Sequence, residues 1–120
     1  LTNEEYKRFR KLEHIFQAYG KEYGVNYLLA AAQGYQESRL NQSVRSGAGA
    51  IGVMQLLPST AAGASVGIAN IKDVDSDIHA GIKYLDYLRN RYFKEVDDKW
   101  NKTFLALAAY NAGPSRMINM

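Results

Sequence analysis

Several features that would define a function class are missing from this sequence of 120 residues. It contains no cysteine, which excludes disulfides, cysteine-based zinc sites and thiol nucleophiles. The two histidines, His14 and His79, lie far apart in the sequence without a ligand pattern beside them, so no metal site is expected. No apolar run approaches the roughly 20 residues of a membrane-spanning helix, and no signal peptide opens the chain. Metal, thiol and membrane-spanning functions are therefore not expected.

Composition predicts one compact domain over residues 1–120, because 47% of the residues are hydrophobic and 22% are charged. The formal net charge is only +3, and the basic residues are scattered apart from short clusters. A nucleic-acid partner is therefore not expected. The chain begins with Leu1 rather than methionine, and we expect it to be an excised or processed piece of a longer protein.

Helical periodicity dominates the chain, and no segment alternates with period two for long enough to predict a strand. Thr2 and Glu5 form a capping box, and Asn26 is a good N-cap. Glycine and serine gather between residues 39 and 53, which predicts a structured loop. We therefore predict an all-α fold, with helices over about residues 3–19, from Asn26 to about Ser38, and from Pro58 to about Ala64. A fourth helix is predicted to be capped by Asp75, Ser76 or Asp77 and to contain Ile78, Ile82, Leu85 and Leu88. A fifth is marked by Trp100, Phe104, Leu107 and Ala108 and ends at Gly113-Pro114, after which another helix is predicted to start.

Glu37 is the polar residue that most needs an explanation, because it lies at the end of an apolar helix just before the loop. If it is buried there, desolvation and the negative end of the helix dipole both raise its pKa. A carboxylic acid that stays protonated near neutral pH can serve as a general acid. The alternative is a helix-end glutamate that pairs with Arg39 or Arg45 in water.

Three short motifs carry a resemblance to a known family. They are Glu37-Ser38, Gly52-Val53-Met54-Gln55 and Ala109-Tyr110-Asn111, in that order. With them, residues 22–116 resemble the catalytic domain of the family-1, soluble-lytic-transglycosylase type of lytic transglycosylases. The resemblance implies an all-α, goose-lysozyme-like helical domain that cleaves peptidoglycan and needs no cofactor. Family domains continue through further helices after Ala-Tyr-Asn-Ala-Gly-Pro, so this chain is expected to lack its last helices.

The resemblance also implies a mechanism in which one glutamate makes every proton transfer. Glu37 would protonate the glycosidic oxygen of the β-1,4 bond between N-acetylmuramic acid and N-acetylglucosamine. It would then act as base on the muramoyl 6-hydroxyl, which closes to a 1,6-anhydromuramoyl end. No Asp or Glu lies between Glu37 and Asp73, in agreement with a reaction that does not use the second carboxylate of ordinary glycosidases.

Three loop residues match substrate-binding positions of the family. Ser46 matches a serine that bonds near the acid or the muramoyl group, and its alternative role is in a turn. Gln55 offers an amide donor and acceptor to the N-acetyl group of the sugar. Met54 is either an adaptable apolar wall for the saccharide or a core methionine.

Three more candidates lie further along the chain. Tyr110 matches the tyrosine whose hydroxyl approaches the catalytic acid, and Glu37 is its expected partner. Asn111 either contacts the sugar or holds the helix end. Tyr84 either lines the saccharide groove or packs in the core.

The resemblance further implies a place and partners for the full-length protein. It would act in the bacterial cell envelope, in the periplasm with an outer-membrane anchor, on glycan strands and muropeptides, with an N-terminal regulatory domain. Three alternatives stay open: a goose-type lysozyme-like hydrolase in which Glu37 activates water, a catalytically silent glycan-binding module, and an unrelated basic helical interaction domain.

Overall fold

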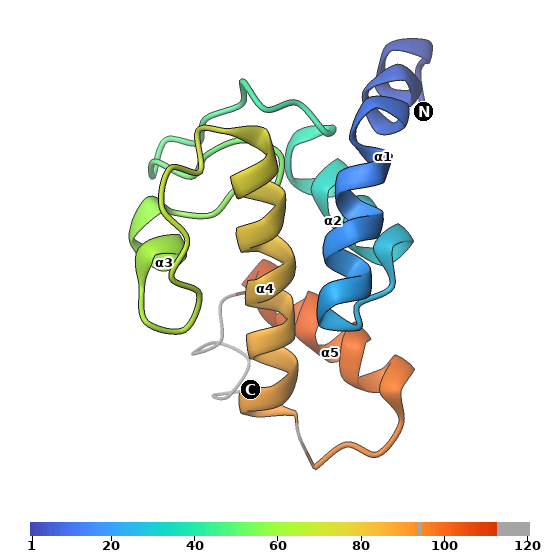
Figure 1. Ribbon diagram of the computed structural model, residues 1–120, viewed down its shortest axis with the longest axis vertical. Coiled ribbons are helices and arrows are strands. Elements are labelled where there is room, and N and C mark those ends of the chain that lie inside the picture. Colours follow the sequence, from blue (N-terminus) through green and yellow to red (C-terminus); the bar gives the residue numbers. More distant parts are fainter. Residues whose placement is uncertain (94, 113–120) are drawn as a thin grey trace.

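The computed structural model describes residues 1–93 and 95–112, which form helices joined by loops (Figure 1). Within these residues the only β-type pairing is a pair of isolated bridges from Ile51 to Arg45 and to Leu56. The predicted all-α class is therefore confirmed for the described part of the chain, in which no helix is long and apolar enough to span a membrane. The helices are α1 (Asn3–Tyr23), α2 (Tyr27–Ser38), α3 (Pro58–Ala62), α4 (Val74–Tyr92) and α5 (Lys99–Ala112).

Helix α1 begins at the predicted capping box but continues to Tyr23, beyond the predicted end at residue 19. Gly20 lies inside the helix, and it is a glycine because its neighbours leave no room for a side chain. A Cβ there would come within 2.7 Å of the Val25 carbonyl oxygen. The helix ends at Gly24, whose φ of +67° lies in the left-handed region that favours glycine. Gly20 thus permits the tight turn into α2 and does not stop the helix.

The other helix ends agree with the sequence in part. Asn26 caps α2 as predicted, accepting hydrogen bonds from two backbone N–H groups, and α3 ends at Ala62, two residues before the predicted end. The N-cap of α4 is Asp73, which accepts from the Ser76 N–H, so the prediction of a later cap was wrong. The predicted stop at Gly113-Pro114 and the helix start after it lie outside the described residues.

Helix α4 is the centre of the packing, with α1 and α5 against it and α2 against α1 (Figure 1). The loop between α2 and α3 crosses the end of the molecule at which α4 begins (Figure 1). Met54 anchors this loop, because its side chain is fully buried between two glycines, Gly34 of α2 and Gly81 of α4. The core built around it also contains Phe16, Ile78, Ile82 and Leu88. The loop is thereby held at the C-terminal end of α2, where Glu37 lies.

Candidate functional site

Glu37 is the penultimate residue of α2 and is half-buried. Burial raises the pKa of its carboxyl group, in the direction that the sequence position predicts. The cations proposed as alternative partners are engaged elsewhere: Arg39 pairs with Glu5 at 3.2 Å, and the Arg45 guanidinium donates to backbone carbonyl groups of the loop. Glu37 is therefore a half-buried carboxyl group with a raised pKa, and neither arginine is its ion-pair partner.

Gln33 is a site residue that the sequence reasoning missed. Its Nε2 donates to the Glu37 Oε1 at 3.0 Å and to the Asn111 Oδ1 at 2.6 Å. The side chain is buried, and it joins the end of α2 to α5. The available signal was a glutamine one helical turn before Glu37 in an apolar run. Asn111, an exposed candidate from the sequence, is thus part of the same network as the acid.

Ser38 fastens the end of α2 to the loop. Its buried hydroxyl lies 3.1 Å from the Gly34 carbonyl oxygen and 2.8 Å from that of Val53. After it the chain turns sharply, since Arg39 and Leu40 both have positive φ. The serine of the Glu37-Ser38 motif therefore holds the acid in place against the motif that begins at Gly52.

Replacing Ser38 by alanine should lower the free energy of unfolding by about 1–3 kcal/mol, because the buried Val53 carbonyl loses its hydrogen-bond donor. Chemical denaturation measures this loss. Ser65→Ala is the matched control, since Ser65 is exposed and its replacement should change stability by less than about 0.5 kcal/mol. Equal stability of the two variants would contradict a fastening role for Ser38.

Tyr110 donates its hydroxyl proton to the Met54 carbonyl oxygen at 2.6 Å. The expected hydrogen bond from Tyr110 to Glu37 was therefore wrong. Burial, aided by the negative charges of Asp77 and Glu37, raises the Tyr110 pKa well above its usual value. The Met54 side chain is fully buried, which corresponds to the core alternative and leaves no apolar wall for a saccharide. Met54 therefore contributes its backbone carbonyl group to the site, as the acceptor for Tyr110, and its side chain belongs to the core.

Ser46 and Gln55 both bind the loop itself. The exposed Ser46 accepts at Oγ from the Ala50 N–H at 2.9 Å, which is the turn role. The Gln55 Nε2 donates to the Val44 and Gly52 carbonyl oxygens at 3.0 and 2.8 Å. Gln55 has a φ of +51°, an unfavourable region for a residue with a side chain. These contacts stabilise a bent loop backbone.

Tyr84 of α4 packs edge-on against Tyr110, with ring centroids 5.4 Å apart, and stacks on Tyr87. Partial burial raises its pKa. Two of the predicted residues, Tyr84 and Tyr110, are therefore in contact, next to Asn111 on the same helix as Tyr110. Among the residues that the structure describes, no group of three His, Asp or Glu side chains could hold a metal ion.

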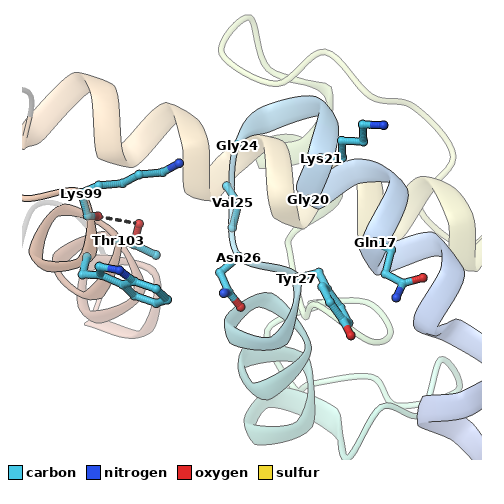
Figure 2. A pocket seen from close by; sticks show the side chains of 10 residues that line it. Gln17, Gly20, Lys21, Gly24, Val25, Asn26, Tyr27, Lys99 and Thr103 are labelled. Carbon is cyan, nitrogen blue, oxygen red and sulfur yellow. Dashed lines mark hydrogen bonds between the residues drawn. The ribbon is translucent and has the colours of Figure 1, made fainter.

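A cavity of about 440 Å³ lies at the opposite end of α2 from Glu37. It is formed where the end of α1, the turn into α2 and the start of α5 meet (Figure 2). None of the site residues predicted from the sequence lines it. The candidate site is therefore the junction of α2, the loop and α5 around Glu37.

The chain is similar to known proteins over most of its length. The family model described as "Transglycosylase SLT domain" matches residues 14–120. This domain is lysozyme-like, which confirms the predicted fold. The chain is 37% identical over 111 residues to membrane-bound lytic murein transglycosylase F of Pseudomonas fluorescens Pf0-1, covering 92% of this chain and 22% of that protein. It is 35% identical over 106 residues to membrane-bound lytic murein transglycosylase F 1 of Alkalilimnicola ehrlichii, covering 88% and 21%.

The chain spans about a fifth of the length of these curated relatives. The match nevertheless covers most of the chain and includes Glu37, the loop from Gly52 to Gln55, and Tyr110. The chain therefore belongs to the family of transglycosylase SLT domains.

Proposed function

We propose that this domain is a peptidoglycan lytic transglycosylase that cleaves the β-1,4 bond between N-acetylmuramic acid and N-acetylglucosamine. The observation that carries the proposal is the half-buried Glu37 with a raised pKa, placed where α2, the loop and α5 meet. Gln33 fixes the orientation of its carboxyl group. A carboxyl group whose pKa is raised, so that it keeps its proton to a higher pH, and which is held in one position, suits protonation of a glycosidic oxygen.

The proposed reaction uses Glu37 twice. As general acid it gives its proton to the glycosidic oxygen as the bond from that oxygen to the anomeric carbon breaks. The resulting carboxylate then takes the proton of the muramoyl 6-hydroxyl while the oxygen forms a bond to the anomeric carbon. The products are a 1,6-anhydromuramoyl end and a free N-acetylglucosamine 4-hydroxyl, without consumption of water.

The environment of Glu37 favours this route over ordinary glycoside hydrolysis. A retaining hydrolase needs a second carboxylate about 5 Å from the first, and an inverting hydrolase needs one farther away. Asp77 is the candidate for a second carboxylate, because it lies near enough to Tyr110 to raise the Tyr110 pKa, as Glu37 does. It is fully buried, so it cannot reach a sugar or a water bound beside one. A nucleophile that belongs to the substrate needs no second carboxylate.

We propose that residues 1–120 form one catalytic domain of a longer envelope protein that requires no cofactor. The relatives are named membrane-bound and murein-acting, and a periplasmic location with an outer-membrane anchor suits a peptidoglycan substrate. Glycan strands and muropeptides are the proposed partners, with Ser46, Gln55, Tyr84 and Asn111 as candidate contacts. An N-terminal regulatory domain is proposed for the full-length protein.

Mass spectrometry of the soluble products from purified peptidoglycan tests the proposed function. Muropeptides with anhydromuramoyl ends, lighter by one water than those with reducing ends, are the expected products. Reducing ends would instead identify a lysozyme-like hydrolase. Binding to peptidoglycan without any product would identify a glycan-binding module.

Tyr110→Phe should lower the turnover rate by about tenfold, because the Met54 carbonyl loses its hydrogen bond and the loop next to Glu37 loses a restraint. Initial rates of anhydromuropeptide release measure the effect. Tyr87→Phe is the matched control on the same aromatic cluster. If Tyr110→Phe were as active as this control, Tyr110 would serve packing alone.

Gln33→Leu should shift the alkaline limb of the pH–rate profile to higher pH. The Gln33 amide donates to the Glu37 carboxyl oxygen, and a donor favours the ionised form. Loss of this donor therefore raises the Glu37 pKa further, so that the acid stays protonated to a higher pH. A shift to lower pH would show that Gln33 does not stabilise the carboxylate.

A further inference from the structure

Asp77 is a buried carboxyl group that the proposed reaction does not use. It lies in the first turn of α4 and its exposed fraction is 0%. Its Oδ1 accepts the Met54 N–H at 3.1 Å, whereas its buried Oδ2 has no hydrogen-bond partner within residues 1–93 and 95–112. An ionised carboxylate with an unpaired buried oxygen is costly. The protonation state and role of this group therefore need an explanation.

The unpaired oxygen lies beside the Gln42 side chain and Gly52. Gly52 has a φ of +71°, and a Cβ there would overlap both the Asp77 Oδ2 and the Gln42 amide. The Gln42 amide is itself held in place, because its Oε1 accepts the Val53 N–H at 2.9 Å and its Nε2 donates to the Ile71 carbonyl at 3.0 Å. A carbonyl oxygen has two lone pairs, so the Gln42 Oε1 has capacity for a second donor.

The charged surroundings do not supply a close cation to Asp77. Arg45 of the loop is exposed and acts on it only through longer-range attraction. Tyr110 is the titratable group that α5 brings near, and it is neutral. The α1 residue Tyr19 donates to Asp75 instead, and α3 contains no charged residue. Burial raises the pKa of Asp77 to about 7, and it outweighs the nearby Gln42 amide, the Met54 N–H and the attraction of Arg45, each of which lowers that pKa. The Gln42 Nε2 donates to the Ile71 and Lys72 carbonyl oxygens, which leaves the Gln42 Oε1 as the amide atom that can face the Asp77 Oδ2.

A short chain of contacts connects Asp77 to Glu37. Asp77 binds the Met54 N–H, and the Met54 carbonyl binds the Tyr110 hydroxyl. The preceding carbonyl, that of Val53, lies against the Ser38 hydroxyl, next in sequence to Glu37. Both carboxyl groups also lie near enough to Tyr110 that their negative charges, when they are ionised, raise its pKa. These contacts connect Asp77, through the backbone of the loop, to the C-terminal end of α2.

We propose that Asp77 is a positioning residue for Glu37 that works as a neutral carboxylic acid. Its Oδ1 accepts the Met54 N–H, and the proton on its Oδ2 is directed at the Gln42 amide oxygen. Ionisation places an unpaired negative charge in the core and releases the loop from its register with α2 and α5. The effect on activity rests on the proposed function, whereas the protonation of Asp77 does not.

Nuclear magnetic resonance of the unmutated chain tests the protonation directly. The Asp77 side-chain carboxyl carbon and the Met54 amide should titrate together, with a midpoint near pH 7. An Asp77 carboxyl already ionised at pH 5, or a Met54 amide that does not follow it, would overturn the proposal. This measurement needs no substrate and no variant, so it stays decisive if the variants fold poorly.

Asp77→Asn provides the second test, because it keeps the shape of a neutral carboxylic acid at every pH. The pKa of about 7 in the folded state lies above 3.8, the usual value of an aspartate carboxyl group. Between these values the folded state holds a proton that the unfolded state has released, so stability falls as pH rises. The unfolding midpoint of Asp77→Asn minus that of the unmutated chain should therefore increase from pH 4 to pH 7 and then level off. A difference that stays constant with pH would overturn the proposal. Asp97→Asn is the matched control, because Asp97 is exposed, and its difference from the unmutated chain should stay constant with pH.

Kinetics separates positioning from simple packing. At pH 6, Asp77→Asn should keep kcat within about threefold of the unmutated chain. Asp77→Ala should lose about tenfold to hundredfold in kcat with little change in KM, because Glu37 is misplaced. An Asn variant as impaired as the Ala variant would show that the charge is needed and would overturn the proposal. A complete lack of activity in the unmutated chain would contradict the proposed function instead, and the two measurements above would still decide the state of Asp77.

Discussion

Glu37→Gln should lower the rate of anhydromuropeptide release by about 10²–10⁴-fold, because it removes the proton on which both steps depend. Glutamine keeps the shape of the protonated acid, and its amide can still face the Gln33 side chain, which bonds to this position at 3.0 Å. Substrate binding should therefore change much less than turnover. Product quantification by mass spectrometry, together with a peptidoglycan pull-down, measures the two separately.

The same substitution should not destabilise the domain at neutral pH. Burial raises the pKa of Glu37 in the folded state above 4.5, the usual value of a glutamate carboxyl group. In the interval between the two values the folded state holds the extra proton, so the stability of the unmutated chain falls as pH rises. Glutamine has no such dependence, and the unfolding midpoint of Glu37→Gln relative to the unmutated chain should increase with pH. A large loss of stability at every pH would mean that the inactivity came from misfolding.

Glu4→Gln is the matched control for this experiment. It makes the same chemical change in the exposed first turn of α1. Glu4 forms an ion pair with Lys7 at 3.7 Å, and both side chains are more than 70% exposed. An exposed ion pair of this kind contributes little to the free energy of unfolding. The control should keep full activity and nearly unchanged stability. Full activity of Glu37→Gln would overturn the assignment of the catalytic acid.

Gly81→Ala should destabilise the domain although alanine is the better helix former. A Cβ at this position of α4 would lie 2.5 Å from the Met54 Cγ and 2.7 Å from its Cβ. Met54 is fully buried and cannot move aside without moving its backbone. Overpacking costs about 1–3 kcal/mol and helix propensity returns about 1 kcal/mol, so we expect a net loss of up to about 2 kcal/mol.

This change should also reduce activity, since the Met54 backbone binds both Asp77 and Tyr110. Thermal unfolding and initial rates measure the two effects. Gly47→Ala in the exposed loop is the matched control, because a Cβ there meets nothing within 4 Å. It should change stability by no more than about 0.5 kcal/mol. If Gly81→Ala unfolded at the same temperature as Gly47→Ala, the close approach of Met54 to α4 would not constrain the site.

The sequence was sufficient for the features that depend on local chemistry. The capping box at Thr2 and the N-cap at Asn26 act within one helical turn, so residue type and spacing determine them. The position of Glu37 at the end of an apolar helix indicated that burial, if present, would raise its pKa, and the pKa is raised by burial. The order of the three motifs predicted the family, because each motif is a contiguous stretch of sequence.

Tertiary structure alone decided which partners these residues have. Gln33 reaches Asn111, and Tyr110 reaches the Met54 carbonyl rather than Glu37, across large separations in sequence. No periodicity encodes such pairs, because they depend on how the helices cross and on the path of the loop. Gly20 has the same origin: by residue type it is a helix stop, but in the fold the Val25 carbonyl occupies the space that a side chain would need. Local propensity therefore determined the helices, and close packing between distant segments determined the site.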